Sequence, residues 1–258
     1  MNKKSFLNLL ENRARRIEGL YPKVHDWQPF FREFSNAIPE FSTLLDFGCG
    51  EGEYLIRLVN EHSNSYGVGV DIQGNSVKKA VQRAVNQNLK HRLDFIKGDL
   101  QHMPFEKEVF DGVIAKDIFH HLPNFLSIIE LSKIIKTGGK LLVIDQPMTH
   151  PLKFFIRKIV QFVNIHSYTY GESFQFFSPD MLEHTLRKNN FKILKKQYAE
   201  FLYYFLYLFV LLPDSFFRFV LSMLSNNLNT MSRMEKTFGR LPVINKFCAY
   251  VYFQAIKT

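Results

Sequence analysis

An aspartate and three glycines form the stretch of this 258-residue sequence whose spacing most clearly predicts chemistry. Residues 44–54 read LLDFGCGEGEY, so Asp46 ends a hydrophobic run and Gly48, Gly50 and Gly52 follow at every second position. Glycines at the carboxyl end of a parallel strand allow a tight turn and a close approach of the backbone to a ligand. The helix expected after them offers N–H donors. The pattern therefore predicts a cofactor loop.

Two classes of cofactor compete for this loop. A dinucleotide fingerprint reads G-x-G-x-x-G, whereas this loop reads G-x-G-x-G and has Glu53 at the third glycine position. Glu51 and Glu53 would repel a pyrophosphate, because all of these groups are anionic. A ligand with a cationic amino group and a sulfonium has no such conflict, and the acidic Asp46 favours it. Asp71, which lies 21 residues after Gly50, can accept both hydroxyls of a ribose in either class.

A third acidic residue follows the hydrophobic run 92–96. Asp99 can accept a hydrogen bond from an adenine amino group, and the Leu100 amide can face the ring. Taken alone, Asp99 is typical of a turn residue after Gly98. Because it stands in register with Asp46 and Asp71, a binding role is favoured.

Strands and helices alternate around these residues. This alternation predicts an α/β fold with a mostly parallel sheet and helices on both faces. Thr137-Gly138-Gly139 is interpreted as a helix stop before a strand. The expected strands are 43–47, 66–71, 92–96, 110–115, 140–145, 191–198 and 249–257, and the expected helices are 52–61, 74–87, 124–136 and 179–189.

Five segments together resemble a known family. LLDFGCGEGEY, GVGVD, GDLQHMPF, FDGVIAKDIFHHLPN and KTGGKLLVIDQ resemble, in order and spacing, the motifs of class I S-adenosylmethionine-dependent methyltransferases of the small-molecule and lipid type. The resemblance covers about 40–146, with a weaker match at 178–199 and 247–258. It implies a Rossmann-like, doubly wound sheet of seven strands whose last strand is antiparallel. It also implies S-adenosyl-L-methionine as the cofactor. The apolar residues after 200 predict, in addition, a helical insertion before the last strand.

The resemblance also implies roles for single residues. It places the backbone of Gly48, Cys49 and Gly50 against the methionine moiety, and Asp46 beside its amino group. Lys116 occupies a position that offers a backbone carbonyl to the same amino group, where a smaller residue is commoner. The remaining implied contacts are Asp71 at the ribose and Asp99 with Leu100 at the adenine, and Ile72 is a further expected cofactor-binding residue.

Histidines supply the candidate catalytic bases, because transfer to an oxygen acceptor calls for a group that takes its proton. His120 follows the fourth expected strand, next to the transferred methyl group, and His150 and His166 lie in a segment that faces the acceptor. His121 is interpreted as packing the loop. The spacing of His, Asp and Glu predicts no metal site.

The acceptor is predicted from aromatic and basic residues. The chain has 27 phenylalanines and a formal net charge of +9. Residues 201–212 read FLYYFLYLFVLL, which is shorter than the roughly 18 residues of a membrane-spanning helix. A lid over the acceptor site, a dimer interface and an interfacial membrane element remain alternatives for 201–225. The basic, apolar segment 153–163 suits an anionic membrane surface. A large apolar site predicts a hydrophobic small molecule or lipid as the acceptor.

We therefore expect a methyltransferase that acts on such an acceptor at or near a membrane. Nucleic acid is disfavoured because the aromatic residues form apolar blocks, although an RNA or protein methyltransferase and a non-catalytic cofactor-binding partner subunit remain alternatives. Two cysteines and no recognised secretory signal favour a cytoplasmic location, with peripheral contact at the inner face of a membrane as an option. The sequence leaves the oligomeric state open. The expected parts are a helical cap (1–40), the core (41–200, with an acceptor-side insertion at about 147–177), the apolar insertion (201–246) and a closing strand (247–258).

Overall fold

A computed structural model describes most of the α/β region of the chain and parts of the remainder. The chain divides into two compact units. The α/β unit comprises Gln28–Gln146, Ser173–Lys196 and Tyr252–Thr258, and the helical unit comprises Met1–Trp27, Pro147–Glu172 and Gln197–Val251. The described residues are 9, 12–13, 16, 28–122, 125–147, 178–199, 209, 212–238, 240–241, 248 and 250–258.

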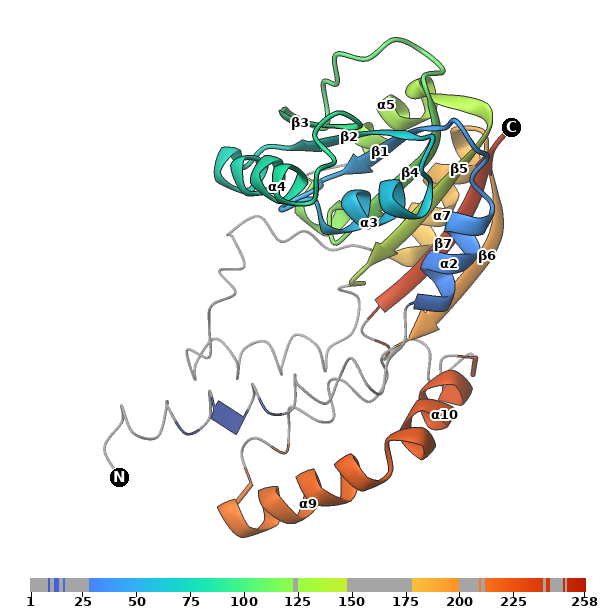
Figure 1. Cartoon of the computed structure of the whole chain (residues 1–258). Coiled ribbons are helices and arrows are strands. Elements are labelled where there is room, and N and C mark those ends of the chain that lie inside the picture. The colour runs from blue at the N-terminus through green and yellow to red at the C-terminus, as the bar shows by residue number, and fades with distance from the viewer. Residues whose placement is uncertain are drawn as a thin grey trace. The chain divides into compact units, whose positions relative to one another are not determined.

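One seven-stranded sheet, with the strand order β3-β2-β1-β4-β5-β7-β6, dominates the α/β unit (Figure 1). The pairs β1–β2, β2–β3, β1–β4 and β4–β5 are parallel. Strand β7 runs antiparallel to its neighbours, so the expected fold class is confirmed. The strands are β1 Thr43–Phe47, β2 Tyr66–Asp71, β3 Leu93–Lys97, β4 Phe110–Lys116, β5 Ile135–Asp145, β6 Phe191–Ala199 and β7 Tyr250–Lys257.

The strand order contains a switch point between β1 and β4. The chain moves outward from β1 through β2 to β3 and then returns to β4 on the other side of β1. Crossover connections diverge there, and such a point leaves a crevice at the carboxyl ends of the two strands. The loops after Phe47 and after Lys116 therefore lie at the place where an open α/β sheet binds ligands.

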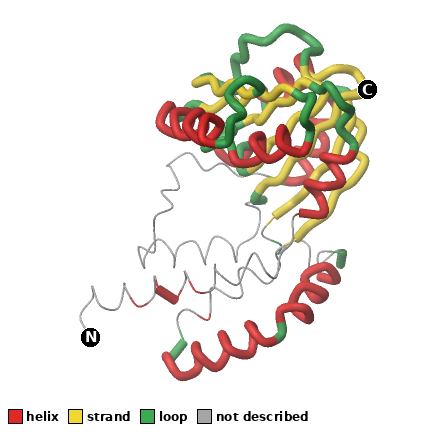
Figure 2. The backbone as a smooth tube through the Cα atoms, viewed as in Figure 1, coloured by secondary structure: helices red, strands yellow, loops and turns green. Residues whose placement is uncertain are grey.

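Helices cover both faces of the sheet (Figure 2). Each of α3, α4 and α7 buries one apolar stripe and exposes polar residues, as amphipathic helices in a layered fold do. In α7, the Ser178 hydroxyl caps the first turn by accepting from the Met181 N–H. The helices are α2 Gln28–Asn36, α3 Glu53–Glu61, α4 Gly74–Asn86, the short 3-10 turn η1 Phe119–His121, α5 Leu126–Ile134 and α7 Pro179–Lys188.

The central strands read as hydrophobic runs because both of their faces are covered. Leu44, Leu45 and Phe47 of β1 and Val113 and Ile114 of β4 are all buried. Strand β3 lies at the edge of the sheet and has three exposed residues. Charged residues on an edge strand discourage pairing with another chain.

One expected element boundary is wrong. Helix α5 ends at Ile134 and strand β5 begins at Ile135, so Thr137-Gly138-Gly139 does not stop the helix. Phe110 of β4 pairs with Ile135, and Gly112 pairs with Lys140, so the register shifts between the two pairs. Residues 136–139 therefore form an irregularity within β5, and Gly138 supplies the positive φ of +83° that it contains.

Two helices are described in the helical unit, α9 Asp214–Asn226 and α10 Leu228–Phe238. The buried Arg13 guanidinium donates to the Leu212 carbonyl (2.6 Å), pairs with Asp214 (3.0 Å) and stacks over the Phe217 ring, 4.9 Å from its centroid. These contacts fix the first turn of α9. No helix among the described residues is long and apolar enough to cross a membrane. The segments 153–163 and 201–208 lie outside the described residues.

Candidate active site

The glycine loop after β1 is held by the end of β2. The Gly48 and Cys49 N–H groups both donate to the Val70 carbonyl, at 2.9 and 3.0 Å. The Gly50 N–H donates to Asp71 Oδ2 at 2.8 Å. The three glycines of the loop have φ values of +84°, +51° and +76°, a region that favours glycine. The sequence pattern thus produces a tight loop against the carboxylate that ends β2.

The three glycines serve different purposes. A Cβ on Gly48 would come within 2.7 Å of the Ile118 side chain, and one on Gly52 within 2.6 Å of the Phe95 ring. These two glycines are needed for packing. A Cβ on Gly50 would meet no atom within 4 Å. Gly50 therefore borders open space, as the predicted close approach of a ligand to the backbone requires.

Asp46 is a buried carboxylate without a full set of partners. It is the penultimate residue of β1 and 1% exposed, and its Oδ2 has no hydrogen-bond partner in the structure. Burial raises the pKa of Asp46 to about 7, against the opposing effect of a backbone hydrogen bond from Leu55. A buried acceptor is costly unless a donor reaches it. The residue is therefore suited to a cationic group such as an amino acid ammonium, which fits the methionine end of the expected cofactor.

Asp71 has the geometry of a ribose acceptor. Its Oδ1 accepts from the Gln73 N–H at 2.8 Å, and its Oδ2 accepts from the Gly50 N–H at 2.8 Å. The two bonds fix the carboxylate, and an ionised carboxylate has further lone pairs for two hydroxyls. The next residue, Ile72, is 65% exposed, an unusual position for a large apolar side chain that suits stacking of a flat ring.

Asp99 lies two residues beyond β3. Its Oδ1 accepts from the Gln101 N–H at 2.9 Å, and its Oδ2 lies 3.1 Å from His102 Nδ1. These contacts, the Gln101 bond first, lower the pKa of Asp99. They form the local turn that the sequence also suggested, and the carboxylate stays ionised there. The neighbouring Leu100 is buried.

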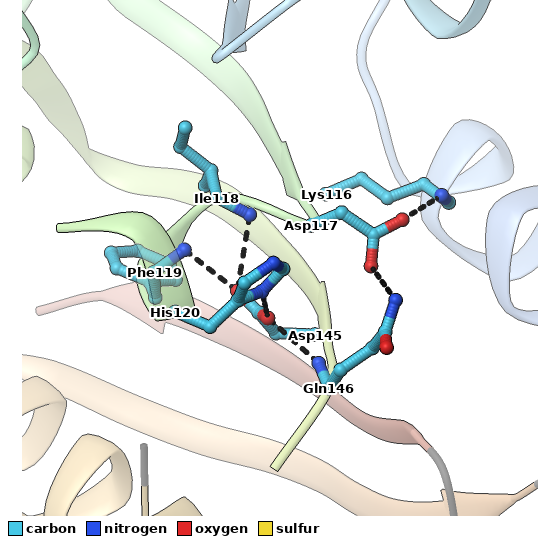
Figure 3. Close-up of polar contacts among 7 residues, drawn as sticks. All are labelled: Lys116, Asp117, Ile118, Phe119, His120, Asp145 and Gln146. Carbon is cyan, nitrogen blue, oxygen red and sulfur yellow. Dashed lines mark hydrogen bonds and ion pairs between the residues drawn. The ribbon is translucent and has the colours of Figure 1, made fainter. Parts of the chain in front are cut away.

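Lys116 ends β4 with its ammonium in a polar network (Figure 3). Its Nζ pairs with Asp117 and lies 5.2 Å from the centroid of the Tyr54 ring. Burial lowers the pKa of Lys116, but Asp117 and Tyr54 outweigh it and hold the pKa above its ordinary value. Gln146 Nε2 donates to Asp117 Oδ1 at 3.2 Å. Asp117 itself adopts φ = +52°, which turns the chain after β4.

His120 and Asp145 form a buried pair beside this network (Figure 3). Nδ1 of His120 contacts Oδ1 of Asp145, and both side chains are nearly inaccessible to solvent. Asp145 also accepts from the N–H groups of Phe119 (2.7 Å), Gln146 (2.7 Å) and Ile118 (3.2 Å). Burial opposes both charges, yet each residue stabilises the other, so the pKa of His120 is raised and that of Asp145 is lowered.

His121 lies against this pair, its ring centroid 4.1 Å from that of His120. Burial and the positive charge of His120 lower the pKa of His121. The pKa values of the two adjacent histidines are thus shifted in opposite directions: Asp145 raises that of His120, whereas burial and the charge of His120 lower that of His121.

Three of these side chains come close enough to surround a cation. Ligand atoms of Asp117, His120 and Asp145 lie within 4.8 Å of one another. The Asp117 carboxylate is, however, already bonded to Lys116 and Gln146, and Asp145 accepts from three backbone N–H groups and from His120. We interpret the cluster as a charge-balanced hydrogen-bond network and assign no metal to it.

The structure brings most of the expected site residues to one edge of the sheet. Cys49 is buried in the glycine loop, and burial, with Asp46 and Asp71 adding to it, raises the pKa of its thiol. His150 and His166 lie outside the described residues. Asp145 and Asp117 were not anticipated. Asp145 nevertheless ends an expected strand, as Asp71 does, so the signal was available.

The strand order, the antiparallel last strand and the glycine loop at the switch point together define the class I methyltransferase fold. Residues 40–161 match a family model described as a methyltransferase domain. The chain therefore carries a methyltransferase domain of class I, the class that depends on S-adenosylmethionine. The predicted methyltransferase family and the predicted cofactor, S-adenosylmethionine, are thus confirmed.

The chain also resembles individual known proteins. A sterol 24-C-methyltransferase of Kluyveromyces lactis is 31% identical over 117 residues, which are 45% of this chain and 31% of the relative. A 27-O-demethylrifamycin SV methyltransferase of Amycolatopsis mediterranei is 31% identical over 103 residues, 40% and 38% of the two chains. The match thus spans about a third of the length of these relatives. The crystal structure of geranyl diphosphate C-methyltransferase from Streptomyces coelicolor has a TM-score of 0.61 at 13% identity, covering 90% of this chain and 79% of that one.

Proposed function

We propose that this chain transfers the methyl group of S-adenosylmethionine to a hydrophobic small molecule or lipid. One observation carries the proposal: three groups follow one another along the carboxyl edge of β1 and β2. They are a buried carboxylate with an unbonded oxygen, a glycine that borders open space and a carboxylate fixed by two backbone N–H groups. They belong to Asp46, Gly50 and Asp71. This order matches the ammonium, the methionine chain and the ribose of the cofactor.

Each residue has a distinct task in this proposal. Asp46 binds the ammonium, Gly50 admits the methionine chain, and Asp71 accepts the ribose hydroxyls. Ile72 covers one face of the adenine, while Asp99 and the Leu100 N–H lie at its polar edge. The bound cofactor supplies an activated methyl group on a sulfonium, and the protein aligns it with the acceptor and excludes water.

The nature of the acceptor is inferred from the apolar character of the chain and from its relatives. The relatives above are named for a sterol, a rifamycin and geranyl diphosphate, which all carry large apolar parts. Their names describe those proteins, and they favour a hydrophobic acceptor for this chain. The apolar sequence at 201–212 points in the same direction.

We also propose peripheral contact with the inner face of a membrane. Helix α9 exposes Phe216, Phe219 and Met223 at 50%, 63% and 48%. Their spacing places them in one stripe along the helix, beside the stripe of the buried Phe217, Val220, Leu221 and Leu224. Arg218 lies next to the exposed side chains and is itself largely exposed. An apolar stripe beside a basic residue suits the boundary of an anionic lipid layer.

The experiment has two stages. Calorimetry with S-adenosylhomocysteine and with NAD tests which cofactor binds. We expect S-adenosylhomocysteine to bind and NAD not to bind. Labelled S-adenosylmethionine is then incubated with a lipid extract, with total RNA and with a protein extract. Label in the lipid fraction supports the acceptor class. Label in the RNA or protein fraction would replace it with the alternative methyltransferases, and cofactor binding without transfer to any fraction would favour a non-catalytic partner subunit.

A further inference from the structure

A cationic side chain lies near the buried carboxylate of Asp46. Asp46 of β1 pairs in register with Ile114 of β4, and Lys116 follows Ile114 by two residues. Because side chains alternate along a strand, the side chains of these three residues share one face of the sheet. Burial raises the pKa of Asp46, and the charge of Lys116 is among the effects that oppose this rise. Two opposite charges therefore lie near each other at the carboxyl edge of β1 and β4.

The first turn of helix α3 contacts both charges. The Leu55 N–H forms a backbone hydrogen bond with Asp46, and the Lys116 ammonium lies 5.2 Å from the centroid of the Tyr54 ring. Two consecutive residues of one helical turn thus contact the carboxylate and the ammonium. The Lys116 side chain keeps 22% of its surface exposed, so a ligand in the crevice at this edge can reach it.

The methionine end of S-adenosylmethionine carries both charges. Its amino and carboxylate groups are attached to one carbon atom, so the group that binds the carboxylate must lie near the group that binds the ammonium. A carboxylate that leaves water without gaining a donor binds at a high cost in free energy. The carboxylates of Asp46 and Asp71 would repel it, whereas the Lys116 ammonium would attract it.

We propose that the Lys116 ammonium binds the carboxylate of the cofactor's methionine end, beside the ammonium that Asp46 binds. The inference rests on the proposed function and deepens it, because the two side chains together make the site selective for a complete amino acid group. This role belongs to the Lys116 side chain, and it is additional to the backbone role that the family resemblance implies.

The partners of Lys116 keep it charged for this role. The cofactor brings an ammonium and a sulfonium to this edge of the sheet, and nearby positive charge favours loss of the lysine proton. Burial acts in the same direction, but Asp117 and Tyr54 hold the pKa of Lys116 above its ordinary value. An ammonium has three N–H donors, so it can hold Asp117 and a second oxygen ligand together. Gln146 Nε2 donates to Asp117 Oδ1 at 3.2 Å, which limits the repulsion between Asp117 and a bound carboxylate.

The test compares two ligands that differ by one carboxylate. S-adenosylhomocysteine has the complete amino acid group, and its decarboxylated analogue, the adenosyl aminopropyl thioether, keeps only the amine. Calorimetry on the wild-type chain measures both dissociation constants. Because hydrogen bonds between charged groups are the strong ones, we expect S-adenosylhomocysteine to bind at least about tenfold more tightly than the analogue.

Lys116→Met removes the charge and keeps an apolar side chain of similar length. We expect S-adenosylhomocysteine to bind at least about tenfold more weakly to this variant. The analogue should bind as before or more tightly, because its amine is no longer repelled by the lysine. Lys133→Met is the matched control, because Lys133 is exposed on α5 and pairs with Glu130, and it should leave both dissociation constants unchanged.

Two further variants separate the binding role from folding. Lys116→Met combined with Asp117→Asn leaves neither charge of the pair without its partner. Asparagine tolerates the φ of +52° at position 117 and can still accept from Gln146. This double variant should show the same loss of preference for S-adenosylhomocysteine over the analogue. Lys116→Arg keeps the positive charge and should retain most of the preference.

The outcomes distinguish the inference from the proposed function. A wild-type preference for S-adenosylhomocysteine that disappears with the Lys116 charge supports the inference. Equal binding of the two ligands by the wild type overturns it without any variant having to fold. A preference that survives in Lys116→Met, or in the double variant where the single one does not fold, also overturns it. If neither ligand binds the wild type, the proposed function fails, and the inference fails with it.

Discussion

The backbone N–H of Gly50 donates to the carboxylate of Asp71 across 21 residues of chain, at 2.8 Å. This bond joins the loop that follows β1 to the residue that ends β2. It fixes both parts of the predicted cofactor site relative to each other before any ligand binds. Preorganisation of this kind lowers the entropic cost of ordering the site when the ligand binds.

Replacement of Asp71 by alanine should remove most of the cofactor affinity. The ribose would lose its acceptor, and the Gly50 N–H would lose its partner. Because hydrogen bonds to a charged group contribute roughly 1.5–3 kcal/mol each, we expect the dissociation constant of S-adenosylhomocysteine to rise by at least about 100-fold. Calorimetry measures it. Asp94→Asn, an exposed acid on β3 bonded to Tyr66, is the control, and equal affinity in wild type and Asp71→Ala would contradict the ribose assignment.

Alanine at Gly50 and at Gly52 should separate binding from folding. A Cβ at Gly50 meets open space, so its cost to stability is the strain of φ = +51°, about 1 kcal/mol. It should nevertheless weaken cofactor binding more than tenfold, because the ligand needs that space. A Cβ at Gly52 would approach Phe95 to 2.6 Å, so this variant should lower the melting temperature by a larger amount. The assignment fails if Gly50→Ala binds the cofactor as wild type does.

Cofactor binding should strengthen as the pH rises from 6 to 8. The folded, ligand-free protein holds Asp46 at a pKa of about 7, above its ordinary 3.8, so at pH 6 the carboxyl is mostly protonated. An ammonium prefers the ionised form, and binding then releases a proton. The cofactor affinity should therefore fall by up to about tenfold for each pH unit below 7, and it should level off above pH 7. Calorimetry in buffers of different ionisation enthalpy counts the protons, and Asp46→Asn should bind weakly with no such slope.

The charge pair should stabilise the fold over a defined pH range. The raised pKa of His120 gives stability that is present below its ordinary 6.5 and lost as the pH rises through the folded pKa. The lowered pKa of Asp145 gives stability that is present above 3.8 and lost as the pH falls through the folded pKa. Asp145→Asn should therefore destabilise most between about pH 4 and 6.5, by roughly 3–5 kcal/mol for a broken buried pair.

Thermal unfolding of Asp145→Asn at pH 5.5 and pH 9 tests this pH dependence. The loss should be smaller at pH 9, because the charge on His120 declines as the pH rises, while the bonds of residue 145 to the backbone N–H groups and to His120 still differ between the two proteins. Asp180→Asn, at an exposed position of α7, should change little at either pH. A loss of stability that is the same at both values would show that the charge on His120 does not contribute.

The exposed stripe of α9 should govern association with lipid. Replacing Phe216, Phe219 and Met223 by serine removes apolar area without touching the buried side of the helix. We expect at least about tenfold weaker partitioning to vesicles of phosphatidylglycerol and phosphatidylcholine, with unchanged binding of S-adenosylhomocysteine. Val81→Ser with Val85→Ser on α4 is the control, because these two residues are exposed on a different helix. Equal sedimentation of all three proteins with vesicles would remove the proposed membrane contact.

The sequence alone determined the elements and the cofactor loop. Strands β1 and β2 have the expected bounds, because a buried strand consists of a local run of hydrophobic residues that can be recognised in the sequence. A glycine turn is likewise recognised from a local pattern. The acidic residues Asp46 and Asp71 were found because each lies at or next to the end of a strand, and the carboxyl ends of parallel strands gather at one edge of the sheet.

Only the tertiary structure decided which of these residues act together. The pairing of His120 with Asp145 spans 25 residues and depends on β4 lying beside β5. The difference between Gly50 and Gly52 depends on where Phe95 of β3 lies, and the irregularity at Thr137-Gly138-Gly139 depends on which residue Phe110 pairs with. These contacts join parts of the chain that no local pattern connects, because burial and pairing are set by the packing of the whole sheet.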